Sequence, residues 1–278
     1  MERLLAGGGF FEGPRWHEGR WWVSDFLRGL VLAVDPRGVA EEVLRVEGRP
    51  SGLGWLPDGS LLVVSMTERR VLRHSPEGRV SVHAELGEHC GGDANDMVVA
   101  EDGTAYVGNF GFDFPGGEPA PTNLVRVDRD GTASVAAAGL LFPNGTVISP
   151  DGRTLVVAET FGERLTAFTI ADDGSLRDRR AWAGLPGAAP DGCTLDADGC
   201  IWVADPASAR CARVAEGGAI VAELAAPEGL RFYACMLGGD DGRTLLLCAA
   251  PGFGRKHRDA LAAELLTARV EAPHAGRP

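Results

Sequence analysis

Side chains that offer an oxygen ligand recur at wide intervals along the chain, each just before an apolar run. They are Glu12, Ser51, Asn95, Asn144 and Asp191. Two carboxylates and two amides are the ligand types of a hard divalent cation, and Ca²⁺ takes six to eight oxygens at about 2.3–2.6 Å. No His or Cys stands at these positions, which argues against a zinc-type cage. The alternative is that these side chains line a wet channel and hydrogen-bond to water or to each other.

A sequence repeat indicates how these distant side chains could meet. An acidic residue followed by glycine recurs at spacings of 40, 44, 49, 47 and 43 residues. The six copies are Glu18-Gly19, Asp58-Gly59, Asp102-Gly103, Asp151-Gly152, Asp198-Gly199 and Asp241-Gly242. Asp-Gly between apolar runs is a strong hairpin signal, because both central positions of the tight turn favour positive φ. A run rich in β-forming residues follows each copy, as in residues 20–24, 60–64 and 200–204.

A period of 40–50 residues with about four short strands per unit is typical of a β-propeller. The sequence therefore predicts an all-β fold, a six-bladed β-propeller with four strands per blade, as a single domain over residues 1–278. A last strand near residues 265–270 is expected to complete a blade and close the ring against the N-terminal segment. The alternative is an open β-sandwich with coincidental Asp-Gly turns, which six in-phase copies disfavour.

The innermost strand of each propeller blade lines the central channel, so corresponding residues near its start form a ring. The repeats are aligned on their Asp-Gly turns, with the first repeat one residue shorter in its turn. The ring positions are then Glu12, Ser51, Asn95, Asn144, Asp191 and Ala234. The fold thus predicts that the oxygen ligands converge at one end of the channel.

Three connections are expected to cap the same end of the channel. Residues 110–122 are aromatic and proline-rich, which suits a pocket wall, and residues 86–94 enter from the same side. Residues 251–263 contain the most basic stretch of the chain. Its basic residues are Arg255, Lys256, His257 and Arg258. Loops of this length often carry function, and a solvated basic loop is the alternative to an anion clamp.

The composition and net charge of the chain argue against several classes of binding partner. Lys and Arg total 27 against 39 Asp and Glu, a net charge of −12 that repels phosphate backbones and argues against nucleic acid. No apolar run approaches the roughly 20 residues that span a bilayer, and the first residues do not resemble a signal peptide, so no membrane partner and a cytoplasmic location are expected. The six cysteines form no C-x-x-C pair and are expected to be small buried hydrophobes.

The chain resembles the regucalcin (senescence marker protein), gluconolactonase and luciferin-regenerating enzyme family of six-bladed propellers, over essentially its whole length. The motifs that carry the resemblance are Phe11–Trp16 (FEGPRW), Asn95-Asp96, Phe142–Gly145 (FPNG), Pro190–Gly192 (PDG) with Ile201–Ala204 (IWVA), and Leu237–Gly239 (LGG). The resemblance implies that Glu12, Asn144 and Asp191 bind one divalent metal. It also implies that Asn95 contacts metal-bound water or substrate.

One position departs from the family pattern. Sugar-lactonase members often carry an Arg two residues before the Asn that matches Asn95, and here that residue is Asp93. An acidic residue there puts an aldonolactone substrate in doubt.

Together with the ring of oxygen ligands, the resemblance implies a divalent-metal-dependent lactonase acting on a small-molecule lactone or ester. The metal is expected to be Ca²⁺, with Mg²⁺, Mn²⁺ or Zn²⁺ as alternatives; it would polarise the lactone carbonyl. Asp191 is the candidate general base for water and Asn95 would hold the carbonyl or the water. Two other functions remain open: a phosphotriesterase-like hydrolase on the same metal site, and a non-catalytic small-molecule-binding propeller.

Overall fold

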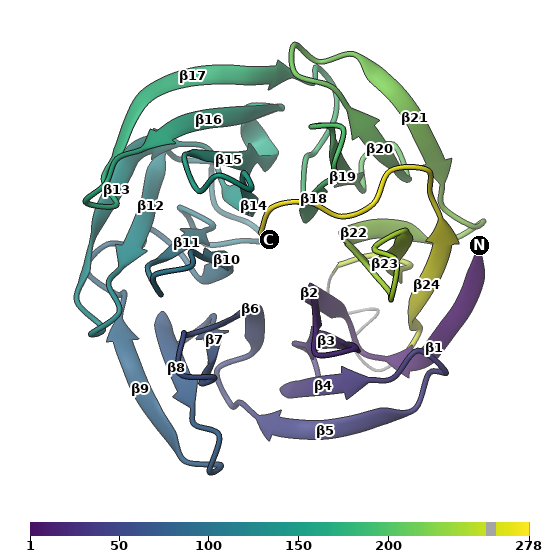
Figure 1. The fold of residues 1–278 in the computed structure, drawn as a ribbon, viewed down its shortest axis with the longest axis horizontal. Coiled ribbons are helices and arrows are strands. Elements are labelled where there is room, and N and C mark those ends of the chain that lie inside the picture. Colours follow the sequence, from purple (N-terminus) through teal and green to yellow (C-terminus); the bar gives the residue numbers. More distant parts are fainter. Residues whose placement is uncertain (254–259, 278) are drawn as a thin grey trace.

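Six four-stranded antiparallel sheets are arranged as blades around a central channel in the computed structural model, which describes residues 1–253 and 260–277 (Figure 1). In five blades the sheet order follows the sequence, with the first strand innermost. The predicted six-bladed β-propeller is therefore confirmed.

The strand bounds show the repeat directly. Blade one comprises β2 (Phe11–His17), β3 (Arg20–Asp25), β4 (Leu30–Val34) and β5 (Ala40–Arg45). Blade two comprises β6 (Pro50–Trp55), β7 (Leu61–Ser65), β8 (Arg70–His74) and β9 (Val80–Glu85). Blade three comprises β10 (Ala94–Val99), β11 (Ala105–Asn109), β12 (Thr122–Val127) and β13 (Ala133–Leu140). Blade four comprises β14 (Pro143–Ile148), β15 (Thr154–Glu159), the 3₁₀ helix η1 (Thr160–Gly162), β16 (Arg164–Ile170) and β17 (Leu176–Gly184). Blade five comprises β18 (Cys193–Leu195), β19 (Ile201–Asp205), β20 (Arg210–Val214) and β21 (Ile220–Ala225).

Blade six closes the ring with strands from both ends of the chain. It comprises β22 (Arg231–Gly238), β23 (Thr244–Ala250), β24 (Ala263–Arg269) and β1 (Glu2–Gly8). The N-terminal β1 pairs antiparallel with β24 as the outermost strand, so backbone hydrogen bonds join the two ends. This confirms the expected closure of the last strand against the N-terminal segment.

The turns between first and second strands are of two kinds. At Glu18-Gly19 both residues have positive φ (48° and 75°), as a two-residue turn requires. At the five Asp-Gly copies only the glycine has positive φ, so the expectation of two such residues is wrong there. In these longer turns the aspartate side chain instead stabilises the turn by a hydrogen bond to the backbone. Asp102 Oδ1, for example, accepts the Thr104 N–H at 2.8 Å.

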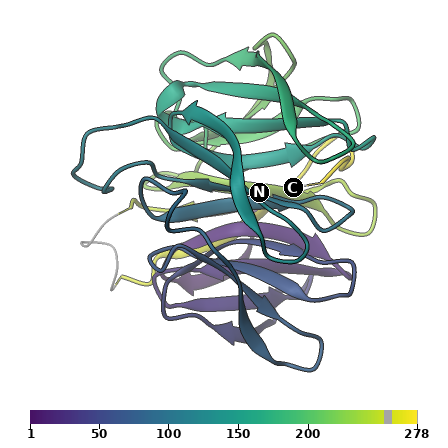
Figure 2. The same ribbon diagram turned by 90° about the vertical axis from the view of Figure 1, so that its left-hand side faces the viewer.

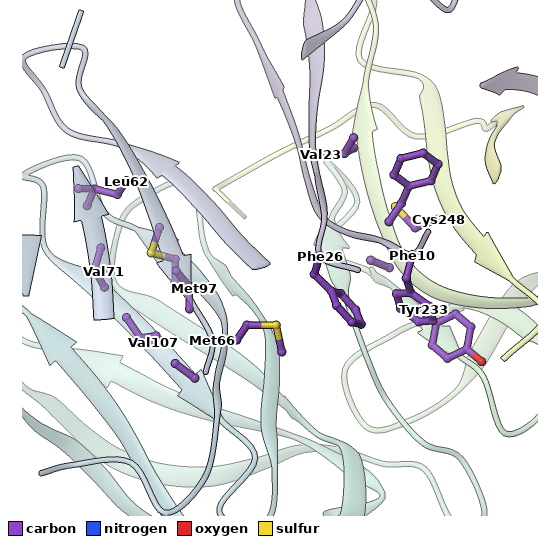
Figure 3. Packing of buried hydrophobic residues seen from close by; sticks show 14 of the residues in the cluster. Phe10, Val23, Phe26, Leu62, Met66, Val71, Met97, Val107, Tyr233 and Cys248 are labelled. Carbon is purple, nitrogen blue, oxygen red and sulfur yellow. The ribbon is translucent and has the colours of Figure 1, made fainter. Parts of the chain in front are cut away.

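Apolar side chains from neighbouring blades pack face to face and form the core (Figure 3). Leu62, Val71, Met97 and Val107, from blades two and three, belong to one fully buried cluster. Five of the six cysteines are also buried, as expected of small hydrophobes. The packing holds the inner strands in fixed positions around the channel.

The two ends of the channel are covered differently. The chain's last described residues cross the end where the Asp-Gly turns lie: His274 N–H donates to Gly242 O at 2.8 Å and Arg277 pairs with Ile148. At the other end the connection between β11 and β12 projects beyond the blades (Figure 2). Within residues 1–253 and 260–277, no helix is long and apolar enough to cross a membrane.

Candidate metal and substrate site

A cavity of about 400 Å³ opens at the end of the channel where the inner strands begin. Glu12, Asn95, Asn144 and Asp191 all line it, so the structure brings the four predicted site residues together. Ser51, at the equivalent position of blade two, lies behind Asn95, and its hydroxyl donates to Asn95 Oδ1 at 3.3 Å. Ala234 completes the ring without a polar atom.

An irregularity in the inner strands aims the ring side chains at the cavity. The register between the first two strands breaks at the ring position in five blades. The breaks lie between Glu12 and Arg15, Pro50 and Leu53, Ala94 and Met97, Pro143 and Thr146, and Phe232 and Ala234. Bulges of this kind redirect a side chain and often occur beside active sites. In blade five Asp191 instead precedes β18, with its N–H donating to Ala204 O at 2.9 Å.

A glycine follows the ring residue in four blades and lets adjacent inner strands approach closely. A Cβ added at Gly13 would lie 2.5 Å from Ser51 O, and one added at Gly145 would lie 2.5 Å from Asp191 O. Neither contact is possible for a real side chain, so glycine is required for this spacing. The close spacing explains how ring residues from different blades reach one cavity.

The electrostatics of the site are dominated by two half-buried acids, Glu12 and Asp191. Burial raises the pKa of Glu12 well above its ordinary value, and the charges of Asp191 and Asp96 raise it further. Burial also raises the pKa of Asp191, with Asp96 again adding to the shift, while hydrogen bonds from Asn144 and the Gly192 N–H oppose it. Two carboxyl groups held close together in a partly enclosed cavity favour either protonation or a bound cation.

The amide of Asn144 is oriented by its neighbours. Its Nδ2 donates to Thr160 Oγ1 at 3.1 Å, and the Thr160 hydroxyl in turn donates to Pro190 O at 2.8 Å. Because the amide nitrogen is engaged in this way and with Asp191, the amide oxygen is the atom left for a ligand.

The donor set fits a hard divalent cation. It offers the carboxylates of Glu12 and Asp191 and the amide oxygen of Asn144, from three different blades. Of the described residues that line the cavity, none is an arginine, lysine or histidine that could balance these acids. The oxygen-only chemistry suits Ca²⁺, Mg²⁺ or Mn²⁺ better than a site of nitrogen and sulfur ligands.

A second set of cavity residues follows a repeated pattern that the sequence analysis did not use, although it did expect one member, Phe110, in the pocket wall. In five blades the second strand ends in a buried polar residue, and the residue just after it lines the cavity. The pairs are Asp25-Phe26, Ser65-Met66, Asn109-Phe110, Glu159-Thr160 and Asp205-Pro206. The polar residue fixes the loop: Asp25 accepts the N–H groups of Gly9 and Phe10 at 2.9 and 3.0 Å. This repeated polar residue at the end of the second strand is a signal in the sequence that could have revealed the cavity residues that follow it.

Tyr233 was also missed, because it lies one residue before the alanine of the blade-six ring position. Its ring packs on Phe10, with centroids 4.6 Å apart, and both line the cavity with Phe26 and Met66 (Figure 3). Burial raises the pKa of Tyr233 to about 12, so the phenol stays protonated and is a hydrogen-bond donor at neutral pH.

The predicted capping loops contribute unequally. Phe110 and Phe114 from residues 110–122 line the cavity, as expected of a pocket wall, and Phe253 lines it from residues 251–263. The basic residues Arg255, Lys256, His257 and Arg258 lie outside the described residues. Asp93 is not among the described lining residues; its carbonyl accepts the Phe110 N–H at 2.9 Å.

Fold and site together define a six-bladed β-propeller with an acidic cluster at the mouth of its channel. The sequence model of one protein family, the SMP-30/gluconolactonase/LRE-like region, matches residues 10–251. The chain belongs to this family. Comparison with curated proteins finds a 6-deoxy-6-sulfogluconolactonase of Pseudomonas putida, 25% identical over 92% of this chain and 88% of the relative.

Solved structures share the fold. A luciferin-regenerating enzyme superposes with a TM-score of 0.83 at 16% identity, over 99% of this chain and 97% of the other. A calcium-binding protein, regucalcin, from Agrobacterium tumefaciens superposes with a TM-score of 0.82 at 20% identity, over 100% of this chain and 96% of the other.

Proposed function

We propose that this chain is a divalent-metal-dependent lactonase that opens a small-molecule lactone. The observation that carries the proposal is the convergence of Glu12, Asn144 and Asp191, with Asn95 beside them, on one cavity at the channel mouth. Membership of the family and the name of the curated relative support lactone hydrolysis. The calcium-binding name of one structural relative supports Ca²⁺ as the first metal to test.

In this proposal Glu12, Asn144 and Asp191 hold the cation. When bound, it supplies a Lewis acid that polarises the carbonyl of the substrate. Asn95 hydrogen-bonds the substrate carbonyl or the attacking water, in an orientation set by Ser51. The protonated phenol of Tyr233 is a further donor in the same cavity.

Asp191 is proposed as the general base. Its carboxylate removes a proton from the attacking water as the water oxygen bonds to the carbonyl carbon. The ring C–O bond then breaks, and the leaving oxygen takes up the proton that Asp191 removed from the water. The products are a carboxylic acid and a hydroxyl group on one molecule. The apolar wall of the cavity limits access of bulk water, which strengthens the electrostatic interactions of these groups.

The test is proton release by the purified protein with γ-, δ- and aromatic lactones. Each is assayed as purified, after EDTA, and after restoring Ca²⁺, Mg²⁺, Mn²⁺ or Zn²⁺ singly. We expect turnover that is lost with EDTA, restored by one cation, and absent from Asp191→Ala and Glu12→Gln. Full activity of metal-free Asp191→Ala would contradict the scheme. Turnover of phosphotriesters but of no lactone would assign the site to phosphotriester hydrolysis instead.

A further inference from the structure

The cavity above the acidic cluster has a wall of aromatic rings from four blades. Phe10, Phe26, Phe110, Phe142, Phe161 and Tyr233 all line it. Phe110 and Phe142 stack with centroids 4.4 Å apart and planes 11° apart, and Phe142 meets Phe161 edge-on at 5.3 Å. On the other side, Phe10 contacts Phe26 and Tyr233 at 4.8 and 4.6 Å. The rings therefore form two packed groups on opposite sides of the cavity.

Two further rings, Phe114 and Phe253, contact each other over the cavity. Phe114, from the connection between β11 and β12, stacks on Phe253, which follows β23, with centroids 5.3 Å apart and planes 29° apart. Blades three and six lie opposite each other in the six-bladed ring (Figure 1). A ligand that reaches the acidic cluster therefore lies beneath and between aromatic surfaces.

Apart from the Tyr233 phenol, few polar groups remain for the body of such a ligand. The Thr160 hydroxyl already pairs with Asn144 and Pro190, and Glu163 accepts the Gly187 N–H at 2.8 Å. Glu12, Asn95, Asn144 and Asp191 belong to the ring proposed to hold the cation and the reacting carbonyl. A polyhydroxylated ring would bury hydroxyl groups against phenyl faces, where lost hydrogen bonds to water are not replaced.

We propose that the substrate is a lactone with an aromatic or otherwise apolar body, and that the aromatic rings select it. This inference rests on the proposed lactonase function and adds the substrate class. The reacting carbonyl points at the acidic cluster, and the apolar body packs against the rings of Phe142 and Phe161. A cavity of about 400 Å³ is in the size range of pockets for small organic ligands.

The first arm of the test compares two lactones. Turnover of 3,4-dihydrocoumarin, an aromatic δ-lactone, and of D-glucono-δ-lactone is measured on the metal-loaded protein. We expect kcat/KM to favour the aromatic lactone by about 100-fold, the scale on which unmatched polar groups are rejected. Hydrolysis of both with a preference for the sugar lactone would overturn the substrate class and leave the lactonase function intact.

The second arm measures binding without turnover. The uncleaved lactam analogue 3,4-dihydro-2-quinolinone is titrated by calorimetry into wild type, Phe161→Ser and Val135→Ser. Phe161 is 41% exposed at the cavity and Val135 is 48% exposed on β13, so both substitutions remove a surface hydrophobe and only one changes the wall. We expect about a tenfold loss of affinity in Phe161→Ser alone.

The two arms separate the possible failures. Lactam binding that depends on Phe161, without hydrolysis of any lactone, would support the apolar ligand class and overturn the lactonase function. Equal affinity of the three proteins for the lactam would overturn the role of the aromatic wall, whatever the outcome of the first arm.

Discussion

The guanidinium of Arg15 donates to the carboxylate of Asp96 at 2.8 Å, and this ion pair joins the inner strands of blades one and three. Arg15 lies on β2 of blade one and Asp96 on β10 of blade three. Their side chains are only 5% and 7% exposed. Arg15 also donates to the carbonyls of Pro14 and Met97. The pair therefore ties non-adjacent blades together just below Glu12 and Asp191, whose pKa values Asp96 raises.

Removing the cation of this pair should destabilise the protein strongly. Arg15→Met leaves the Asp96 carboxylate buried without its partner, at a cost of about 3–5 kcal/mol in the free energy of unfolding. The double variant Arg15→Met/Asp96→Asn removes both charges and should recover part of that loss. Urea denaturation of the three proteins measures the effect.

An exposed ion pair provides the control. Arg45→Met breaks the surface contact with Glu42 at 2.9 Å, and pairs of this kind contribute about 0–1 kcal/mol. If Arg15→Met were no more costly than Arg45→Met, or if the double variant were less stable than Arg15→Met, the channel pair would not have the structural role assigned to it.

Glu12→Gln should have opposite effects on stability with and without metal. In EDTA the variant should melt higher than wild type, because one of two mutually repelling carboxyl groups is gone. With Ca²⁺ at about 100 times its dissociation constant, wild type should gain about 2.7 kcal/mol and the variant much less. For a chain of this size the wild-type gain corresponds to roughly 5–10 °C in Tm.

Thermal melts in EDTA and in CaCl₂ measure the stability of wild type and of Glu12→Gln under both conditions. The control is Glu85→Gln, whose carboxylate is exposed and pairs with Arg70 at 3.0 Å. It should respond to Ca²⁺ as wild type does. A wild-type Tm that no divalent cation raises, or an equal rise in Glu12→Gln, would refute the assignment of Glu12 as a ligand.

The sequence predicted the ring because its residues obey a period that local turn chemistry makes visible. Asn95, Asn144 and Asp191 each stand seven residues before an Asp-Gly turn, and Glu12 stands six residues before Glu18-Gly19. Aligning the turns therefore also aligned these residues, which line one cavity. The same alignment predicted the shorter first turn, where Glu18 adopts positive φ. Periodicity thus specified both the number of blades and the residues at their inner ends.

Contacts between blades that are distant in sequence could not be predicted in the same way. The stacking of Phe114 on Phe253 depends on the path of two long loops from opposite blades, which no repeat encodes. The pairing of Arg15 with Asp96 could not be predicted from the sequence either, because the two residues belong to blades that are not neighbours. Such contacts follow from the closure of the ring in three dimensions.

Gly145→Ala should disturb the site by moving one strand rather than by removing a ligand. The added Cβ would lie 2.5 Å from Asp191 O and 2.6 Å from Cys193 N, so the segment that carries Asp191 must shift. Overpacking of this kind costs about 1–3 kcal/mol, which is roughly 2–12 °C in Tm. Metal affinity, measured by calorimetry, should fall as well.

Gly87→Ala is the control, because nothing lies within 4 Å of its added Cβ. Unchanged metal affinity in Gly145→Ala would show that the close approach of the blades does not position Asp191.

Glu159 should make the fold sensitive to acid. Its buried carboxylate accepts hydrogen bonds from Arg164 at 2.8 and 2.9 Å, from the Leu141 N–H at 2.9 Å and from Thr166. Burial alone would raise its pKa, but these hydrogen bonds outweigh burial and lower it below the ordinary value. A lowered folded-state pKa contributes stability above the unfolded-state value of about 4.3, and that contribution is lost as pH falls through the folded-state pKa.

Glu159→Gln should therefore be less stable than wild type by about 2–3 kcal/mol at pH 7, where the charged hydrogen bonds are present. The difference should shrink steadily below pH 4, because the wild-type carboxylate then becomes protonated too. Chemical denaturation of both proteins between pH 7 and pH 3 measures the difference, with the exposed Glu42→Gln as the control that shows little change. A wild-type advantage that stays constant across this range would mean that lost packing, and not the charge of Glu159, accounts for the effect.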